Sequence, residues 1–202
     1  NQLLTTNGIF IERTREIGQV TPEMGIDYGC TGPMIRGSGV RRDLRFDQPY
    51  LIYDELISNN VFKMIVAGDQ SNGCDWSVGV IGDCWSRYMI RVLEMEESRK
   101  IVLHCLDLLE KEDRDEFDLI KEARRVYRPA KGQEAYVKVE NPRGELGYYL
   151  VSDGKANPYR CRARGPSFNN LSILRELSEG TMVADLCAII GSIDIVLGEV
   201  DR

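Results

Sequence analysis

The sequence predicts an α+β fold: a helical core with one long helix, a small antiparallel β meander, and a C-terminal tail buried in the core. Apolar residues recur at near-helical spacing between positions 83 and 110, which indicates the long helix. From Glu134 onward polar and apolar residues alternate, as half-buried strands require. The residues from Ser192 to the end stay largely apolar, although a free C-terminus usually frays. We therefore expect this tail to pack inside the fold.

Composition narrows the class of protein. The 202 residues are enough chain to bury a core, and a net charge of -6 disfavours a general binder of nucleic acid or anionic membranes. No run approaches the roughly 18 apolar residues of a membrane-spanning helix. The first residues resemble no targeting peptide and include no initiator methionine, so we expect a chain that begins after processing or is a fragment. The six cysteines form no C-x-x-C pair and are interpreted as buried, reduced thiols.

The first 81 residues are expected to contain short elements separated by turns. Residues 1–28 are predicted to form a short helix and a loop, and Thr21 before a proline fits the N-cap of a helix. Residues 29–46 hold four glycines and a proline, which indicates a turn-rich loop where the backbone approaches something closely. Residues 58–81 are rich in turn chemistry, and we expect a short strand at 61–66 followed by a surface loop.

The longest helix is expected to begin at Asp83 and to end near Glu110. Its predicted apolar stripe comprises Tyr88, Val92, Met95, Val102 and Leu106. Burying such a stripe contributes roughly 1.5–3 kcal/mol for each large side chain. The dense charge run that follows is interpreted as a charged linker over residues 110–133.

The meander follows the linker. Strands are expected at residues 134–140, 146–151 and 159–164, with turn residues between them. The third strand places three arginines on one face: Arg160, Arg162 and Arg164. Three cations on one face need acidic partners, within the chain or on a neighbouring subunit. Two short helices, at 171–179 and 182–190, are expected before the tail.

Charged residues are interspersed among the apolar residues of the tail: Asp194, Glu199, Asp201 and Arg202. Carboxylates in or near a core need partners, so we interpret the tail as threaded into the interior with its charges at a polar site. The alternative is a C-terminal strand with a charged tip, which is the commoner use of such a pattern.

Four segments resemble one protein family, in family order along the chain. They are TGPMIRGSGVRRDLR at residues 31–45, GDCWSRY and RVLEMEES within 82–98, PRGELGYYLVSDG at 142–154, and DLCAIIGSIDIVLGEVDR at 185–202. With these segments the sequence is similar to the hydrogenase-like large subunit of respiratory complex I, the proton-pumping NADH:quinone oxidoreductase. That family is distantly related to the large subunits of nickel-iron hydrogenases. Four ordered matches are far more specific than a lone glycine motif.

The resemblance implies that residues 1–202 are the C-terminal part of such a subunit, with the N-terminal half absent from this chain. Residues 58–81 are longer than the corresponding family segment and are interpreted as an insertion loop. The histidine and tyrosine thought to hold the quinone carbonyls lie in the family's other half. This chain alone is therefore not expected to be catalytic: either the protein is split, or the chain is a fragment.

The tail also indicates which metal chemistry to exclude. Nickel-iron hydrogenase large subunits end with D-P-C-x-x-C-x-x-H, whose two thiolates bind the metals. With Asp194 on the aspartate of this motif, Val196 and Glu199 take the two cysteine positions and Arg202 takes the histidine position. A soft metal site needs its soft ligands, so we expect no metal here and no cofactor bound by this chain alone. The resemblance implies that the former metal cavity belongs to a quinone chamber.

The resemblance assigns roles to tail residues. Val196 would line the headgroup end of a quinone slot, with Asp194 and Glu199 in the polar network beside it. Arg202 would lie near the neighbouring iron–sulfur subunit, whose cluster delivers electrons. Plain core packing is the alternative for Val196, and a structural ion pair with an arginine is expected for Asp201.

The glycine-rich segment at 31–45 carries several arginines, among them Arg36 and Arg45. It lacks the G-K-[ST] end of a Walker motif and is not G-x-G-x-x-G, so phosphate binding is the weaker interpretation. We expect these arginines to act as structural or interface charges, paired with acidic groups or with a partner subunit.

The resemblance implies a core peripheral-arm subunit that forms part of the quinone-reduction site next to the terminal iron–sulfur cluster. Its partners would be quinone, the iron–sulfur subunits of the peripheral arm, the N-terminal half or its separate chain, and the membrane-arm subunits, with no nucleic acid. It would be a peripheral membrane protein, on the matrix side of the mitochondrial inner membrane or the cytoplasmic side of a bacterial membrane. The alternative is a non-catalytic assembly or scaffold fragment of the same complex.

Overall fold

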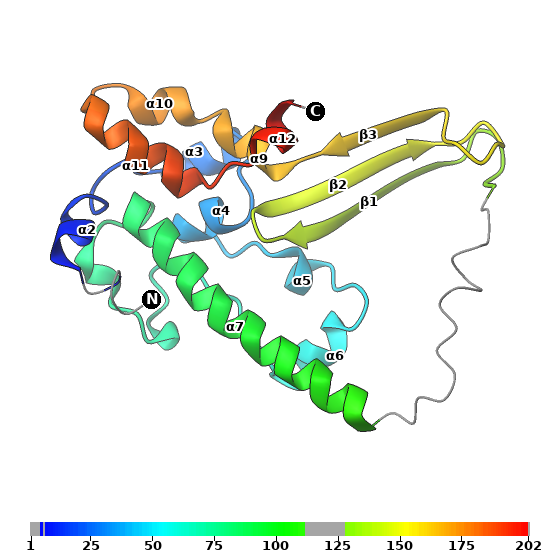
Figure 1. The fold of residues 1–202 in the computed structure, drawn as a ribbon, viewed down its shortest axis with the longest axis horizontal. Helices are drawn as coiled ribbons and strands as arrows, with labels where there is room; N and C mark the ends of the chain where they lie inside the picture. The colour runs from blue at the N-terminus through cyan, green and yellow to red at the C-terminus, as the bar shows by residue number, and fades with distance from the viewer. Residues whose placement is uncertain (1–4, 6, 112–127, 202) are drawn as a thin grey trace.

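A computed structural model describes residue 5 and residues 7–111 and 128–201 of the chain. The helices gather on one side of the molecule, and a three-stranded sheet projects away from them (Figure 1). The predicted α+β class, with one long helix and an antiparallel meander, is confirmed. Most of the charged linker expected at 110–133 lies outside the described residues.

Short helices dominate the architecture. In chain order the described α-helices are α2 (Gly8–Glu12), α3 (Pro22–Asp27), α4 (Pro33–Gly37), α5 (Leu44–Asp47), α6 (Tyr53–Ser58), α7 (Cys84–Lys111), α9 (Pro166–Leu171), α10 (Leu174–Ser178), α11 (Val183–Ile193) and α12 (Leu197–Asp201). The helix start predicted at Thr21 is confirmed, because its side chain accepts a hydrogen bond from the Met24 amide and a proline follows it. The predicted loop at 29–46 instead contains α4 and α5.

The long helix α7 begins where the sequence predicts. The Asp83 carboxylate accepts a hydrogen bond from the Ser86 amide at 2.7 Å, which is the geometry of an N-cap. The predicted apolar stripe, however, is wrong in its second half, where three side chains are half exposed or more: Met95 (52%), Val102 (57%) and Leu106 (50%). The apolar residues of α7 are spread around the helix rather than gathered on one face, so spacing alone did not single out the buried side.

Residues 58–81 differ from the prediction of a strand and a surface loop. Residues 61–66 form no strand, and two short 3-10 helices, η1 (Gln70–Asn72) and η2 (Trp76–Val78), follow. Backbone groups of the segment form isolated hydrogen bonds instead of a strand ladder. For example, the Lys63 amide donates to the Glu97 carboxylate at 2.8 Å. The segment is also not superficial: Ile65, Ala67, Cys74 and Trp76 are buried in one cluster with Trp85 and Ile90 of α7.

The sheet consists of β1 (Glu134–Asn141), β2 (Gly144–Val151) and β3 (Arg160–Arg164), paired antiparallel in that order. This confirms the three predicted strands. Arg162 lies opposite Tyr149 across the β2–β3 pair. The β1–β2 turn packs tightly on the glycine-rich segment, since a Cβ at Gly32 would lie 2.5 Å from the Cα of Gly144. The predicted close backbone approach is therefore present in the structure.

The C-terminal part contains two more helices than predicted, α9 and α12. The expected helix at 171–179 is preceded by α9, and α11 extends the expected helix at 182–190 to Ile193. The tail ends in a short helix, α12, and not in a strand. Its burial in the core reaches Ile193, which is 1% exposed, whereas Val196 is 39% and Leu197 is 67% exposed. The expectation of a fully buried tail is thus corrected from Val196 onward.

The main core joins α3, α4, α10, α11 and the start of α7. Its buried members are Val20, Cys30, Met34, Ile35, Cys84, Ile173, Leu177, Ile189 and Ile193. All six cysteines are unpaired, but the prediction of burial is wrong for Cys161 and Cys187, which are exposed. Across residues 7–111 and 128–201, no helix is long and apolar enough to cross a membrane.

Candidate functional site

The tail leaves the core at Asp194. This residue ends α11 in a left-handed backbone conformation, with φ 59° and ψ 55°. Aspartate is one of the few residues besides glycine that adopts this region at modest cost. The left-handed turn ends the helix directly after the buried Ile193, and Ile195 still packs partly against the main core.

Two arginines from distant parts of the chain bind Asp194. The Arg143 side chain, from the β1–β2 turn, donates through Nε to the Asp194 carbonyl at 3.0 Å and through Nη2 to its Oδ1 at 3.4 Å. Arg91 of α7 donates to the Ile193 carbonyl at 3.3 Å, and its Nε lies 3.5 Å from Asp194 Oδ2. Burial lowers the pKa of Arg91 to about 10, and the Asp194 carboxylate opposes that shift. The start of the tail is therefore held by charge on both sides.

The end of the tail is held by α9. The Ser167 hydroxyl donates to Glu199 Oε2 at 2.5 Å, and the Ser167 amide donates to Oε1 at 3.2 Å. The same hydroxyl accepts a longer, 3.4 Å hydrogen bond from the Val196 amide. Both oxygens of the Glu199 carboxylate are thus engaged within the chain.

A buried charge cluster lies beside the start of the tail. It consists of Arg36, Asp43, Arg45, Glu94 and Glu140. Arg36 is 1% exposed, and its guanidinium donates to Glu94 at 2.6 Å and to Glu140 at 2.7 Å. Arg45 binds the Asp43 carboxylate at 2.6 Å. These charges are taken from water together, which is tolerated only with close pairing.

The pKa values of the cluster show how burial and pairing compete. Burial raises the pKa of Glu140, and the opposing effect of Arg36 does not cancel it. Burial also raises the pKa of Asp43, but the Arg45 and Arg36 guanidiniums bring it below its ordinary value. Glu140 therefore accepts a proton more readily than Asp43.

A cavity of about 470 Å³ connects the charge cluster to the tail. Its charged lining residues are Arg36, Arg45, Arg91, Glu94, Glu140 and Asp194, and Tyr53, Met95, Ser98, Asn141 and Pro142 complete it. Three of the residues that the sequence singled out, Arg36, Arg45 and Asp194, thus border one space. The mixture of alternating charges and a few apolar groups suits a polar headgroup better than a fully apolar ligand.

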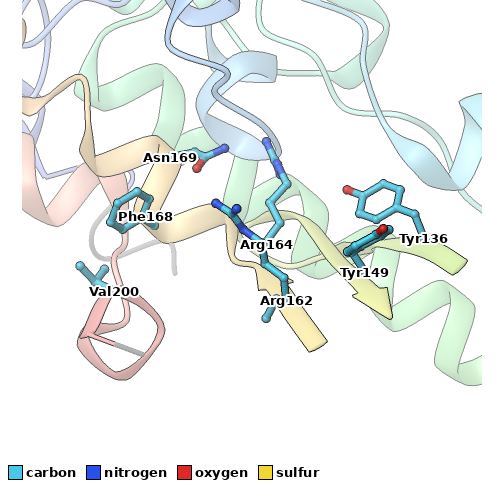
Figure 2. A pocket seen from close by; sticks show the side chains of 8 residues that line it. Tyr136, Tyr149, Arg162, Arg164, Phe168, Asn169 and Val200 are labelled. Atoms are coloured by element: carbon cyan, nitrogen blue, oxygen red, sulfur yellow. The ribbon is translucent and has the colours of Figure 1, made fainter. Parts of the chain in front are cut away.

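A second cavity, of about 480 Å³, lies between the sheet and the end of the tail. Figure 2 shows Arg162 and Arg164 of β3 between the tyrosines of β1 and β2 on one side and Phe168 and Val200 on the other. Arg164 pairs with Glu145 at 3.6 Å, whereas Arg160 and Arg162 form no ion pair with any described residue. Of the three arginines on this face, Arg164 thus has the acidic partner predicted from the sequence within the chain.

The remaining tail residues lie outside these spaces. Val196 lines neither cavity. Asp201 is exposed, and no described arginine pairs with it. Arg202 lies outside the described residues. Among the residues that the structure describes, no three His, Cys, Asp or Glu side chains are grouped so that they could hold a metal ion.

Sequence reasoning missed several residues of this region. Arg91, Arg143 and Ser167 hold the tail, and Glu94 and Glu140 hold Arg36. Each lies far along the chain from its partner, so no local spacing connects them. A usable signal was the imbalance of the 31–45 segment, whose four arginines face one aspartate and therefore require carboxylates from elsewhere.

The fold and the site together define an α+β chain whose C-terminal tail is held by internal ion pairs and hydrogen bonds. The whole chain, residues 1–202, matches the family model described as "Respiratory-chain NADH dehydrogenase, 49 Kd subunit". The chain therefore belongs to this family.

Curated relatives agree with the assignment. The chain is 50% identical over its full length to the D subunit of the NADH-quinone oxidoreductase of Chlorobaculum tepidum, and covers 47% of that protein. It is 48% identical to the D subunits of the same enzyme from Pelodictyon phaeoclathratiforme and Chlorobium phaeovibrioides, over 99% and 100% of the chain and 47% of each relative. The chain thus spans about half the length of the curated relatives it matches.

Proposed function

We propose that this chain forms part of the quinone-reduction site of a proton-pumping NADH:quinone oxidoreductase, as a core subunit of the peripheral arm. The proposal is supported by the tail. Its sequence resembles the end of a hydrogenase-like subunit, and side chains from elsewhere in the fold bind it at both ends. Asp194 is bound by Arg91 and Arg143, and Glu199 by Ser167. Between these anchors, Val196 faces outward with 39% of its surface exposed.

This arrangement provides one wall of a quinone site. Val196 and the more exposed Leu197 supply apolar surface for a ring and a tail. Asp194, two residues before Val196, and the arginines that bind it supply polar groups that can hold a carbonyl or exchange a proton. Asp194 and Glu199 thus belong to the polar network of the site, and Arg36 and Arg45 act as the structural charges behind it. Asp201 and Arg202 keep the role proposed from the sequence, as charges at the interface with neighbouring subunits.

The other walls are proposed to come from partners: the remaining half of the subunit, whether in the same or a separate chain, the iron–sulfur subunits and the membrane arm. The second half of α7 supports this, because its exposed apolar side chains need cover in an assembled protein: Met95, Val102, Leu103, Leu106 and Leu109. The terminal iron–sulfur cluster would be held by a neighbouring subunit and would pass electrons to quinone. The protein would then sit peripherally, on the matrix side of the mitochondrial inner membrane or the cytoplasmic side of a bacterial one.

The substitution Val196→Met tests this proposal in the assembled enzyme. A larger side chain in the wall of the site should change the half-inhibitory concentration of a quinone-site inhibitor by about tenfold, equivalent to about 1.4 kcal/mol, while the complex still assembles on native gels. Val183→Met is the matched control, since Val183 is 87% exposed at the far end of α11. An unchanged inhibitor response in Val196→Met would favour the scaffold alternative.

A further inference from the structure

One buried hydroxyl connects the two ends of the first turn of α12. The Val196 carbonyl accepts hydrogen bonds from the Glu199 amide at 3.1 Å and the Val200 amide at 3.2 Å, so Val196 and Glu199 belong to a single turn. Ser167, which is 1% exposed, binds the Glu199 carboxylate and the Val196 amide with the same oxygen. Moving that oxygen would therefore move the whole turn.

The backbone beneath Glu199 is shaped for this contact. A Cβ placed on Gly165 would lie 2.5 Å from Glu199 Cγ and 2.8 Å from its Cδ, closer than any side chain tolerates. Gly165 has φ -89°, a conformation open to every residue. The missing side chain is thus required by the approach of Glu199 and not by the backbone angle.

We propose that Ser167 is a positioning residue: with Gly165 beside it, it fixes where the Val196 side chain lies in the quinone site. The inference rests on the proposed function. A hydrogen bond from a hydroxyl to a carboxylate is charge-assisted and short, and therefore directional. Two such contacts from one residue, through its hydroxyl and its amide, fix the Glu199 carboxylate against α9. Held in this way by Ser167, Glu199 keeps the first turn of α12, and with it Val196, in place.

A second feature separates this role from simple packing. The start of the tail is already bound by Arg91 and Arg143, whose hydrogen bonds go to Ile193 and Asp194, before the turn that contains Val196. Loss of the Ser167 hydroxyl would leave the start of the tail anchored and release only the stretch that contains Val196. The expected defect is therefore one of binding at the quinone site, not of folding.

The test compares Ser167→Ala with Ser167→Thr in the intact enzyme complex. Thr keeps the hydroxyl. Ser172→Ala is the matched control, because within the described part of the chain the Ser172 hydroxyl bonds only to the nearby Asn169 carbonyl, at 2.6 Å, at the other end of α9. The measurements are the KM for a short-chain quinone, kcat, and the half-inhibitory concentrations of two quinone-site inhibitors. The rate with an artificial electron acceptor that is reduced upstream of quinone corrects for the amount of assembled enzyme.

Ser167→Ala is expected to shift KM and the inhibitor concentrations by about tenfold, as loss of a charge-assisted hydrogen bond implies, and to change kcat less. Ser167→Thr should restore the wild-type inhibitor response, and Ser172→Ala should match the wild type. Should Ser167→Ala fail to assemble, Ser167→Cys replaces it, since the thiol fills the same place but donates a weak hydrogen bond, and an intermediate shift is expected.

The outcomes separate this inference from the proposed function. If Val196→Met changes the inhibitor response and Ser167→Ala does not, the inference is overturned and the proposed function stands. If Val196→Met itself changes nothing, the proposed function fails. If both Ser167→Ala and Ser167→Cys fail to assemble while Ser167→Thr assembles, Ser167 holds the fold together and the positioning role is overturned.

Discussion

Removal of Arg36 is expected to be among the most destabilising single changes in this protein. Arg36 is 1% exposed and lies within 2.7 Å of both Glu94 and Glu140. In Arg36→Met, Arg45 still pairs with Asp43 at 2.6 Å and lies 3.7 Å from Glu94. Glu140 loses its direct ion-pair partner and keeps the Leu44 amide, at 3.2 Å, and the nearby charge of Arg45.

The magnitude follows from the uncompensated charge. Breaking a buried pair by removing one partner costs about 3–5 kcal/mol. For a chain of this size each kcal/mol lowers the melting temperature by about 2–4 °C, so the expected fall is on the order of 10 °C. Arg36→Lys keeps the charge but cannot span two carboxylates, and a smaller fall is expected. The matched control is Arg99→Met on α7, whose pair with Glu96 is exposed and contributes about 0–1 kcal/mol.

The cost should also depend on pH. Burial places the folded-state pKa of Glu140 above its ordinary value, and loss of Arg36 would raise it further. A carboxyl with a raised folded pKa loses stability as pH rises from its unfolded pKa through its folded one. The gap in melting temperature between wild type and Arg36→Met should thus be narrower at pH 5 than at pH 8. Adding Glu140→Gln should recover part of the loss at pH 8.

The assay is thermal unfolding followed by tryptophan fluorescence. Both tryptophans, Trp76 and Trp85, are buried in contact with each other, with ring centroids 6.1 Å apart, so unfolding changes their surroundings strongly. A fall below about 2 °C in Arg36→Met, or a double variant with Glu140→Gln no more stable than the single one, would refute the reasoning. Either result would mean that water or a counter-ion already neutralises Glu140.

Two further predictions concern thiols and glycines. Burial raises the pKa of Cys30 to about 11, so maleimide should label exposed Cys161 in the native protein at pH 7.5 and Cys30 only after unfolding, as peptide mass spectrometry would show; equal labelling would contradict the burial. Gly32→Ala should cost about 2 kcal/mol or more in urea unfolding, because a Cβ would meet Gly144 within 2.6 Å at φ +68°. Gly180→Ala is the control, because Gly180 has φ +78° but open space around it. An equal loss of unfolding free energy in the two variants would mean that the backbone angle causes the whole cost and the contact with Gly144 adds nothing.

Local patterns predicted the elements whose signals are local. The alternation from Glu134 identified all three strands, and Asp83 identified the start of α7, because strand period and capping act over a few residues. The same logic failed at 61–66, where a short apolar run predicted a strand. That run packs against α7 with irregular backbone, and its burial depends on Trp85 and Ile90, which the local pattern cannot specify.

At the candidate site, too, the sequence predicted the local features but not the contacts between distant residues. The family resemblance located Asp194, Val196 and Glu199 on the tail, but not what binds them. Arg143 lies 51 positions from Asp194, and Ser167 lies 32 positions from Glu199. Hydrogen bonds over such separations follow from the packing of α9 and the β1–β2 turn against the tail, so the sequence alone could not connect them.

These anchors change how the tail should be understood. The resemblance implies that the tail carboxylates are free to meet a ligand, yet Asp194 and Glu199 are both engaged within the chain. Under the proposed function, a paired carboxylate would approach quinone only by giving up its partner, at a cost comparable to a charged hydrogen bond, about 1.5–3 kcal/mol. The groups that can still bind a ligand at the proposed site are therefore the arginine donors around Asp194 and the apolar surface of Val196 and Leu197. On this argument the tail shapes the site and fixes its charges, and substitutions that keep its anchors should be tolerated better than those that release them.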